Sequence, residues 1–209
     1  MKRIILITGG QRSGKSSKAE ELALQLSDNP VYLATAHIWD EEFKERVRRH
    51  QERRGPQWTN IEEEIHLSKH DLTGRVVVID CVTLWLTNWL VSDPSLSPNP
   101  NTVANGDSLP FVGPEPHSGA PLKTPVALVG EGNLNVDAIL AKAKEEFDKF
   151  TKHDATYIFV TNEIGSGGVS DNALQRRFTD LQGWMNQYIA QKADEVILMV
   201  SGIPLKIKK

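Results

Sequence analysis

The 209-residue sequence contains a single cysteine, Cys81, and no excess of positive charge. A lone cysteine excludes an intrachain disulfide framework, and without a Cys-x-x-Cys pair a structural zinc site is not expected. Its 24 Lys and Arg residues against 27 Asp and Glu give a net charge of −3. Such a chain lacks the basic field that holds a nucleic-acid backbone, so no nucleic-acid partner is expected.

Long hydrophobic runs are also missing. Near the N-terminus, the apolar run 4–7 gives way to Thr8, Gly9 and Gly10. A run this short is neither a signal peptide nor a membrane span, so we expect a cytoplasmic protein without a transmembrane segment. At 23.3 kDa the chain is long enough for one sizeable core, which predicts a single domain over residues 1–209.

Short apolar, β-branched runs alternate with stretches that have helical spacing. The predicted strands are Arg3–Thr8, Val31–Thr35, Arg75–Asp80, Thr156–Thr161 and Glu195–Val200. The predicted helices, with apolar residues at i, i+3 and i+4, are Ser16–Leu26, Glu41–Arg54, Val136–Lys152 and Asn172–Ala193. This alternation is typical of an α/β sandwich whose strands are buried on both faces of a mostly parallel sheet.

One segment, residues 92–135, departs from the alternation. It holds eight of the eleven prolines and five of the fifteen glycines, with few charges and no sustained periodicity. This composition predicts a long insertion within the single domain. Two interpretations stay open, a loosely packed loop and a lid that closes over a substrate.

The strongest motif directly follows the first predicted strand. Its residues are Gly9, Gly10, Gln11, Arg12, Ser13, Gly14, Lys15 and Ser16, and they fit G-x-x-x-x-G-K-[ST] in full. Because the loop leaves a strand and enters a helix, backbone N–H groups and the helix dipole can converge on phosphate oxygens. Lys15 would neutralise the β and γ phosphates, and the Ser16 hydroxyl would ligate Mg²⁺. The motif predicts a P-loop NTPase-like three-layer sandwich.

An acidic residue, Asp80, closes the predicted strand Arg75–Asp80. The carboxyl ends of parallel strands meet at one edge of the sheet, which is also the edge where the phosphate loop opens. Asp80 is therefore a candidate Mg²⁺ ligand beside Ser16. A helix cap is the alternative for an acid in this position.

The sequence Thr151-Lys152-His153-Asp154 matches the T-K-x-D pattern with which some GTPases recognise guanine. That recognition needs a loop that follows a strand at the ligand edge. Here the four residues end a predicted helix and precede a predicted strand. We interpret them as a solvated helix terminus, and a signalling GTPase is disfavoured.

Between Glu41 and Arg54, basic and acidic side chains surround a histidine, His50. Helical spacing puts Arg46, Arg53 and Arg54 close to its face. Nearby cations disfavour protonation of the imidazole, and a neutral imidazole can attack an α-phosphate. Spacing alone leaves two interpretations open, a nucleophile that carries a nucleotidyl group and an incidental histidine on a solvated charged helix.

Two polar residues, Asn162 and Glu163, end a predicted strand at the same edge as the phosphate loop. Contact with a substrate and a structural role both remain open for them. Cys81, which directly follows the candidate metal ligand, has no second cysteine or histidine next to it. We interpret it as a small, buried, apolar residue.

Aromatic residues recur at helical spacing in two places, one of them an additional predicted helix that contains Trp85 and Trp89. Trp85 and Trp89 lie four positions apart among leucines, and packing in the core or at a subunit interface is the preferred interpretation. Trp184 is interpreted in the same way.

Several blocks of the sequence resemble one family. They are GGQRSGKS at 9–16, YLATA at 32–36, RHQERR at 49–54, DCVTLWLTN at 80–88, VTNEIGSG at 160–167 and VSGIPLKIK at 200–208. In this order the blocks resemble the bifunctional adenosylcobinamide kinase / adenosylcobinamide-phosphate guanylyltransferase family of cobalamin biosynthesis. The resemblance covers nearly everything outside the insertion.

The resemblance implies two reactions on a corrinoid substrate. ATP or GTP phosphorylates the aminopropanol hydroxyl of adenosylcobinamide, and GMP then passes from GTP to that phosphate, giving adenosylcobinamide-GDP. It also implies that His50 carries the GMP covalently and that the chain forms a homo-oligomer, with a trimer as one option. The residues that match nucleotide or metal contacts of the family are Gly9–Ser16, Thr35, Ala36, His37, Gln51, Glu52, Arg53, Arg54, Glu62 and Asp80.

Two other functions remain compatible with the sequence. A monofunctional small-molecule kinase would use the same loop without a covalent intermediate. A nucleotide-dependent regulatory module would use binding or hydrolysis to move the insertion.

Overall fold

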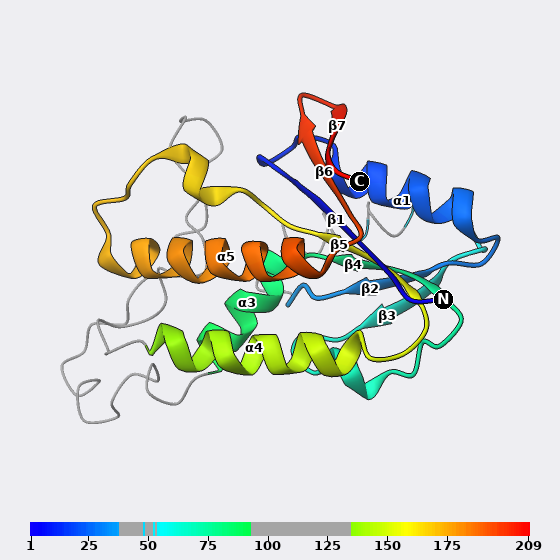
Figure 1. Cartoon of the computed structure of the whole chain (residues 1–209), viewed down its shortest axis with the longest axis horizontal. Coiled ribbons are helices and arrows are strands. Elements are labelled where there is room, and N and C mark those ends of the chain that lie inside the picture. The colour runs from blue at the N-terminus through cyan, green and yellow to red at the C-terminus, as the bar shows by residue number, and fades with distance from the viewer. Residues whose placement is uncertain (38–47, 49–51, 53, 93–134) are drawn as a thin grey trace.

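A seven-stranded sheet forms the centre of the molecule (Figure 1). The structure is a computed structural model that describes residues 1–37, 48, 52, 54–92 and 135–209. In spatial order the strands are β3 (Thr59–Glu62), β2 (Val31–Ala34), β4 (Val76–Asp80), β5 (Thr156–Val160), β1 (Arg3–Gly9), β6 (Glu195–Val200) and β7 (Ile203–Lys208). Neighbouring strands are parallel except β6 and β7, which are antiparallel.

Helices cover both faces of this sheet (Figure 1). On one face lies α1 (Lys15–Leu26), and on the other lie α3 (Val82–Val91), α4 (Val136–Phe150) and α5 (Ala173–Lys192). Two short 3-10 helices, η1 (Leu67–Lys69) and η5 (Ile164–Gly167), lie in connections. The predicted three-layer α/β sandwich with a mostly parallel sheet is confirmed.

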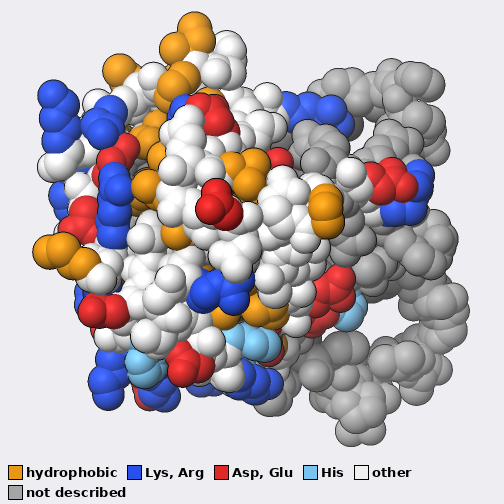
Figure 2. All heavy atoms as spheres, turned by 90° about the vertical axis from the view of Figure 1, so that its right-hand side faces the viewer, with side chains coloured by type: hydrophobic (Ala, Val, Ile, Leu, Met, Phe, Trp, Pro, Cys, Tyr) orange, Lys and Arg blue, Asp and Glu red, His pale blue; other side chains and the backbone are white. Residues whose placement is uncertain are grey.

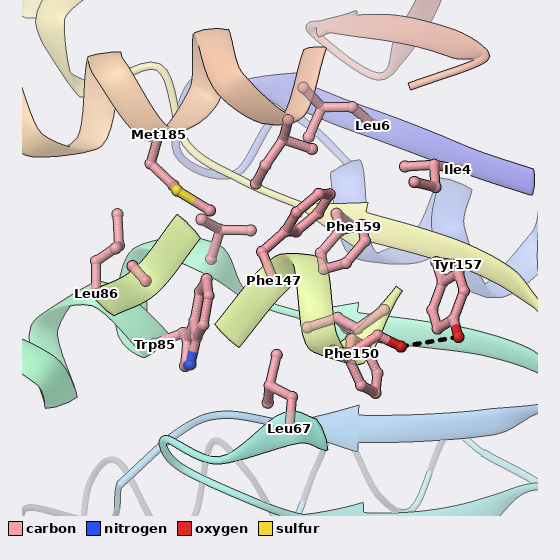
Figure 3. Close-up of a cluster of buried hydrophobic side chains, with 14 of the residues drawn as sticks. Ile4, Leu6, Leu67, Trp85, Leu86, Phe147, Phe150, Tyr157, Phe159 and Met185 are labelled. Atoms are coloured by element: carbon pink, nitrogen blue, oxygen red, sulfur yellow. Dashed lines mark hydrogen bonds between the residues drawn. The ribbon is translucent and has the colours of Figure 1, made fainter. Parts of the chain in front are cut away.

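Strand side chains alternate between two hydrophobic clusters, one under each helical layer. In β1, Ile4 and Leu6 pack with α3, α4 and α5, whereas Ile5 and Ile7 pack with α1. Figure 3 shows the first cluster, in which the ring of Phe147 from α4 lies against that of Phe159 from β5, with ring centroids 5.1 Å apart. Because successive strand side chains point to opposite faces, a continuous apolar run fills both clusters.

Most predicted elements agree with the structure. Each of the five predicted strands ends within one residue of an observed strand, and the predicted helices 16–26, 136–152 and 172–193 end within two residues of α1, α4 and α5. The predicted helix 41–54 lies largely outside the described residues, although Arg48 and Glu52 are helical. The predicted insertion 92–135 lies outside them except for its two end residues.

Two observed strands, β3 and β7, were not predicted. Strand β3 is mostly exposed and has one half-buried apolar residue, Ile61, so it lacks the apolar run that marked the other strands. Strand β7 joins β6 through a two-residue turn in which Ser201 and Gly202 have φ of +50° and +85°. Positive φ at both central residues is the geometry of a type I′ hairpin turn, for which Ser-Gly is a weaker signal than Asn-Gly.

The amino edge of the sheet carries the T-K-x-D sequence. Residue Thr151 caps the end of α4 and is buried, and the Asp154 carbonyl accepts a hydrogen bond from the Gly74 N–H just before β4. Figure 2 looks onto the side of the molecule where β1 begins, and basic and acidic side chains are interspersed on it. The four residues therefore lie at the end of the sheet opposite the phosphate loop, as predicted.

No helix within the described residues is long and apolar enough to span a membrane.

Candidate active site

The phosphate loop leaves the carboxyl end of β1 and enters α1. Gly9 has φ of +150°, and a Cβ at this position would lie 2.4 Å from the Met199 carbonyl oxygen. Gly14, the residue before α1, has φ of +93°. A side chain would be strained at either position, so glycine is required by both the loop conformation and its close packing.

Lys15 is the first residue of α1, and its side chain is directed back into the loop. Only 7% of Lys15 is exposed, and its ammonium donates a hydrogen bond of 2.6 Å to the Gly10 carbonyl oxygen. Burial lowers the pKa of Lys15, and the neighbouring Cys81 and Asp80 side chains oppose part of this shift. Asp80, which the sequence placed at the same edge of the sheet as the phosphate loop, is thus close enough to Lys15 to influence its pKa.

The turn between β6 and β7 supports the loop from the outside. The Gly202 N–H donates to the Ser13 carbonyl oxygen at 3.0 Å. A Cβ on Gly14 would lie 3.5 Å from the Gly202 Cα. The conformation of the phosphate loop thus depends on the β6–β7 hairpin, a contact that was not predicted from the sequence.

Asp80 is held by a tyrosine from the neighbouring strand. The Tyr32 hydroxyl donates a hydrogen bond of 2.6 Å to Asp80 Oδ2. Burial, followed by the negative charge of Asp80 and this hydrogen bond, raises the pKa of Tyr32 well above its ordinary value. The hydroxyl therefore stays protonated and fixes one oxygen of the Asp80 carboxylate.

Arg54 packs over the ring of that tyrosine. Its guanidinium lies 3.6 Å from the centre of the Tyr32 ring, and its Nε donates to Asn60 Oδ1 at 2.9 Å. A third neighbour is Glu20 of α1, at 3.6 Å, and only 3% of the Arg54 side chain is exposed. This enclosure favours an anchoring role for Arg54 over the nucleotide contact implied by the resemblance.

The turn after β2 contains Thr35, Ala36 and His37. The Thr35 hydroxyl donates to the Cys81 carbonyl oxygen at 2.8 Å and accepts from the Cys81 N–H at 2.9 Å. Thr35 is fully buried, whereas Ala36 and His37 are half-buried. Through its side chain Thr35 ties β2 to the start of α3, and the other two residues are the ones that reach the surface.

The remaining candidates divide between exposed and undescribed positions. Gln11 and Arg12 are exposed at the tip of the phosphate loop, and Glu62 is exposed at the end of β3. Glu52 is exposed and forms an ion pair with Arg48. The other three, His50, Gln51 and Arg53, lie outside the described residues.

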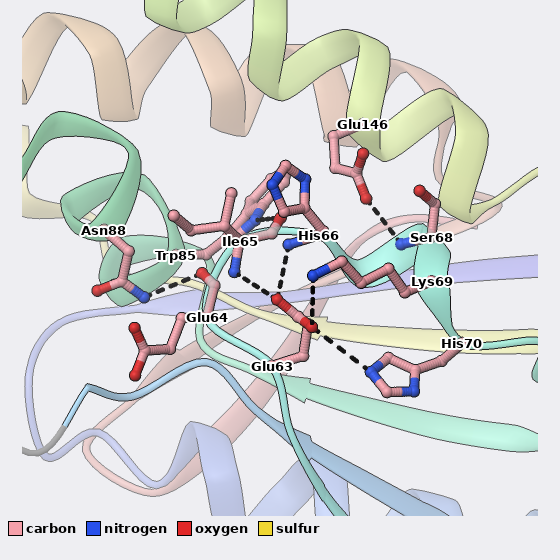
Figure 4. A network of polar contacts seen from close by, with 10 residues as sticks. All are labelled: Glu63, Glu64, Ile65, His66, Ser68, Lys69, His70, Trp85, Asn88 and Glu146. Carbon is pink, nitrogen blue, oxygen red and sulfur yellow. Dashed lines mark hydrogen bonds and ion pairs between the residues drawn. The ribbon is translucent and has the colours of Figure 1, made fainter. Parts of the chain in front are cut away.

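A pocket of about 600 Å³ lies beside the turn after β2. It is lined by Ala36, His37, Glu62, Glu63, Glu64, Ile65, His66 and Lys69. Figure 4 shows how its floor is fixed: Trp85 Nε1 donates to the Ile65 carbonyl oxygen at 2.8 Å, and Asn88 Nδ2 donates to that of Glu64 at 3.0 Å. Trp85 is fully buried, which confirms core packing for it. Trp184 is 44% exposed and so is not a core residue, and packing at a subunit interface stays a prediction for it.

Glu63 caps the loop after β3, which lines one side of this pocket. Its Oε1 accepts hydrogen bonds from the N–H groups of Ile65 and His66, and its Oε2 lies 3.8 Å from Lys69 and 3.7 Å from His70 (Figure 4). Burial alone would raise the pKa of Glu63, but these hydrogen bonds and the neighbouring Lys69 and His70 side chains outweigh burial and lower it. Glu63 was not predicted as a site residue, and its contacts are those of a loop cap.

A buried polar cluster lies beneath the end of β5. Gln182 and Asn186 of α5 contact Thr161: the Thr161 hydroxyl donates to Asn186 Oδ1 at 2.7 Å, and Gln182 Nε2 donates to both partners. Asn186 Nδ2 also reaches Glu163 Oε1 at 3.3 Å, and Asn162 donates to the hydroxyl of Thr83. Asn162 and Glu163, whose role the sequence left open, are thus held by side chains of α3 and α5.

The donor set fits Mg²⁺ better than a transition metal. No group of three or more His, Cys, Asp and Glu side chains in the described part of the chain could hold a metal ion. The Ser16 hydroxyl and the Asp80 carboxylate offer hard oxygen ligands, and Mg²⁺ is commonly held by one or two protein ligands with phosphates and water. Cys81 is buried, and burial raises its pKa to about 12, which confirms a small buried residue rather than a metal-binding thiolate.

Comparison with known proteins gives a consistent result. The model of the family described as cobinamide kinase / cobinamide phosphate guanyltransferase matches residues 5–207. The bifunctional adenosylcobalamin biosynthesis protein CobU of Escherichia coli is 32% identical over 98% of this chain and 99% of its own length. The corresponding protein CobP of Pseudomonas aeruginosa is 31% identical over 97% of this chain and 96% of its own.

Among solved structures, the flagellar accessory protein FlaH from Methanocaldococcus jannaschii aligns with 99% of this chain and 78% of its own. The TM-score is 0.40 and the identity is 14%.

Proposed function

This chain belongs to the cobinamide kinase / cobinamide phosphate guanyltransferase family, and we propose that it catalyses both reactions. In the first, ATP or GTP phosphorylates the aminopropanol hydroxyl of adenosylcobinamide. In the second, GMP passes from GTP to adenosylcobinamide phosphate through a guanylyl group on His50, and the product is adenosylcobinamide-GDP.

The observation that carries this proposal is the phosphate loop between β1 and α1, in which the Lys15 ammonium is buried and Asp80 lies close enough to influence the Lys15 pKa. The loop would hold the phosphates of a nucleoside triphosphate through its backbone N–H groups, and the Lys15 ammonium would exchange its contact with Gly10 for one with the phosphates. Both reactions break a phosphoanhydride bond, so one positively charged site would stabilise the negative charge that develops in each.

The Ser16 hydroxyl and the Asp80 carboxylate would hold Mg²⁺ at this site. The ion supplies positive charge to the phosphate oxygens when it is bound. Tyr32 would keep the Asp80 carboxylate in place through the 2.6 Å hydrogen bond.

The assignment of His50 as the nucleophile follows from the family resemblance, and the anchoring of Arg54 supports it. His50 precedes Arg54 by four positions, and four extended residues span at most about 14 Å. Arg54 itself is fixed against Tyr32, whose hydroxyl contacts Asp80. A position of His50 near the candidate metal ligand is therefore compatible with the length of chain that joins it to Arg54.

A labelling experiment tests the proposal. The protein is incubated with Mg²⁺ and GTP labelled at the α-phosphate, denatured, and examined for label that survives alkali and is released by acid, as a phosphoramidate should be. The label should be present in the wild type and in His153→Ala, which changes an exposed histidine at the amino edge. It should be absent in His50→Ala.

Other outcomes select the alternatives. ATP-dependent phosphorylation of adenosylcobinamide without any protein label would indicate a monofunctional kinase. Nucleotide binding without either transfer would indicate a regulatory module. The cytoplasmic location, the single domain and the homo-oligomeric state stay predictions from the sequence.

A further inference from the structure

Glu163 stands between the phosphate loop and the candidate metal ligand. Strand β5 lies between β1 and β4, and Val160 is level with Ile7 on one side and Asp80 on the other. Three residues beyond Val160, the Glu163 N–H donates to the Gly9 carbonyl oxygen at 3.1 Å. The backbone of Glu163 is thus fixed to the first residue of the phosphate loop.

The Glu163 carboxylate is held through only one of its oxygens. The Thr8 hydroxyl donates to Oε1 at 2.5 Å, and Asn186 Nδ2 approaches the same oxygen at 3.3 Å. Among the described residues no hydrogen bond or ion pair engages Oε2, and the residue is half-buried. One oxygen therefore fixes the orientation and the other remains able to accept a proton.

Buried polar side chains lie behind the Glu163 carboxylate, where α5 packs against the sheet. Thr161, Gln182 and Asn186 are each at most 7% exposed, and Gln182 Oε1 has no hydrogen-bond partner. Burying amide and hydroxyl groups is unfavourable compared with apolar packing unless every partner is satisfied. Positioning of a functional side chain explains why apolar residues do not fill this contact.

The two proposed reactions differ in their need for a base. In the first reaction the nucleophile is a neutral alcohol, which must lose its proton as it attacks phosphorus. In the second the nucleophiles are an imidazole and a phosphate anion, which have lone pairs available without a proton transfer. A base that acts on the substrate is therefore needed for the kinase reaction alone.

We propose that Glu163 is the general base of the kinase reaction. The alcohol proton passes to Glu163 Oε2 while the alcohol oxygen forms a bond to the γ-phosphorus. The bond between that phosphorus and the β,γ-bridging oxygen breaks, and the nucleoside diphosphate leaves. Asp80 is less suited to this task because it is the proposed Mg²⁺ ligand and lies near the Lys15 charge. The inference rests on the function proposed above.

The Glu163→Gln variant tests this role with little disturbance of the structure. A glutamine carbonyl can still accept from Thr8 and Asn186, but the amide cannot take up a proton. The kcat for transfer of labelled γ-phosphate from ATP to adenosylcobinamide should fall at least about 100-fold. GMP transfer from GTP to synthetic adenosylcobinamide phosphate should change less than about threefold, and retained GMP transfer also shows that the variant is folded.

A second variant provides a rescue test, and a third serves as the matched control. Glu163→Ala should lose the kinase activity and regain part of it when formate or acetate supplies an external carboxylate. Glu145→Gln, which removes an exposed carboxylate on α4, should leave both activities unchanged.

Three results would overturn the inference. Full kinase activity in Glu163→Gln would exclude the role as a base. Equal loss of both activities would indicate a ligand of the nucleotide or metal, and kinase activity in Glu163→Ala that formate does not restore would indicate a positioning role. A wild type without either activity would instead refute the proposed function itself.

Discussion

Two glutamates that follow strands at the same edge of the sheet, Glu63 and Glu163, are held in different ways. Glu63 accepts hydrogen bonds from backbone N–H groups two and three residues further along its own loop, and its second oxygen faces two side chains of the same loop. Glu163 is held through one oxygen by Thr8 of β1 and Asn186 of α5.

This difference separates a carboxylate that stabilises a loop from one that is positioned for chemistry. Contacts within one loop form wherever the loop forms, and they use up the whole carboxylate. Contacts from distant elements require the complete fold, and here they leave one oxygen without a partner in the described structure. Contacts between distant elements therefore position Glu163 at the centre of the carboxyl edge of the sheet. Contacts within one loop position Glu63 at the side of that edge.

The largest expected effect concerns the Lys15 ammonium in the phosphate loop. Lys15→Met should lower both phosphate transfer and protein guanylylation by about 10³-fold, or about 4 kcal/mol, because a buried cation at the phosphate loop is lost. Steady-state assays of the two reactions measure this loss. Lys149→Met removes an exposed ammonium paired with Glu145 on α4 and should leave both rates unchanged. Equal rates in Lys15→Met and Lys149→Met would contradict a role for the Lys15 charge in the two reactions.

The next prediction tests whether the buried polar cluster around Asn186, which helps to hold Glu163, stabilises the fold. Asn186→Ala should lower the free energy of unfolding by about 2.5 kcal/mol, because it leaves buried partners on Thr161 and Gln182 unsatisfied. Urea denaturation measures this change. Gln25→Ala on the exposed face of α1 should cost less than about 0.5 kcal/mol. A similarly small effect of Asn186→Ala would show that the buried cluster is not a source of stability.

A smaller effect is expected at the tyrosine that holds Asp80. Tyr32→Phe keeps the ring under Arg54 and removes the 2.6 Å hydrogen bond, so unfolding should become easier by about 1.5 kcal/mol. The Mg²⁺ concentration for half-maximal kinase activity should rise several-fold. Tyr188→Phe removes a hydrogen bond of the same length to Asp148 at an exposed site. This control should leave the Mg²⁺ requirement unchanged, and the same requirement in both variants would refute the positioning of Asp80.

The smallest effect is expected at Glu63 and depends on pH. Because the folded state lowers its pKa, the carboxylate stabilises the fold at pH values above the ordinary pKa of Glu, near 4.5. That contribution is lost as pH falls through the lowered folded-state pKa. Glu63→Gln should therefore destabilise the protein by about 0.5–1 kcal/mol at pH 7 and by less near pH 3. Unfolding curves at the two pH values test this, and a constant difference would contradict it.

The regular part of the fold could be predicted because it rests on local patterns. Runs such as residues 4–7 and 76–79 are apolar throughout, and they are so because both faces of the sheet are covered. Strand β3 escaped prediction because its pairing with β2, rather than its own hydrophobicity, makes it a strand. Strand β7 depends on the turn at Ser201 and Gly202.

The candidate site could be predicted only in part, for a similar reason. The phosphate loop is a contiguous motif, and Asp80 ends a recognisable strand, so the sequence alone was enough to propose both as site residues. The roles of Tyr32 and Asn186 depend on neighbours that are 48 and 23 residues away. No spacing rule links such positions, and their hydrogen bonds became apparent only in the folded chain.

The placement of β1 has a consequence for synthesis on the ribosome. This strand is made first, yet its two neighbours in the sheet are β5 and β6, which are made late. The turn at Gly202 that supports the phosphate loop is made later still. A nascent chain that has emerged only as far as α4 therefore has neither flanking partner for its first strand, and we expect triphosphate affinity to arise after translation of the final hairpin.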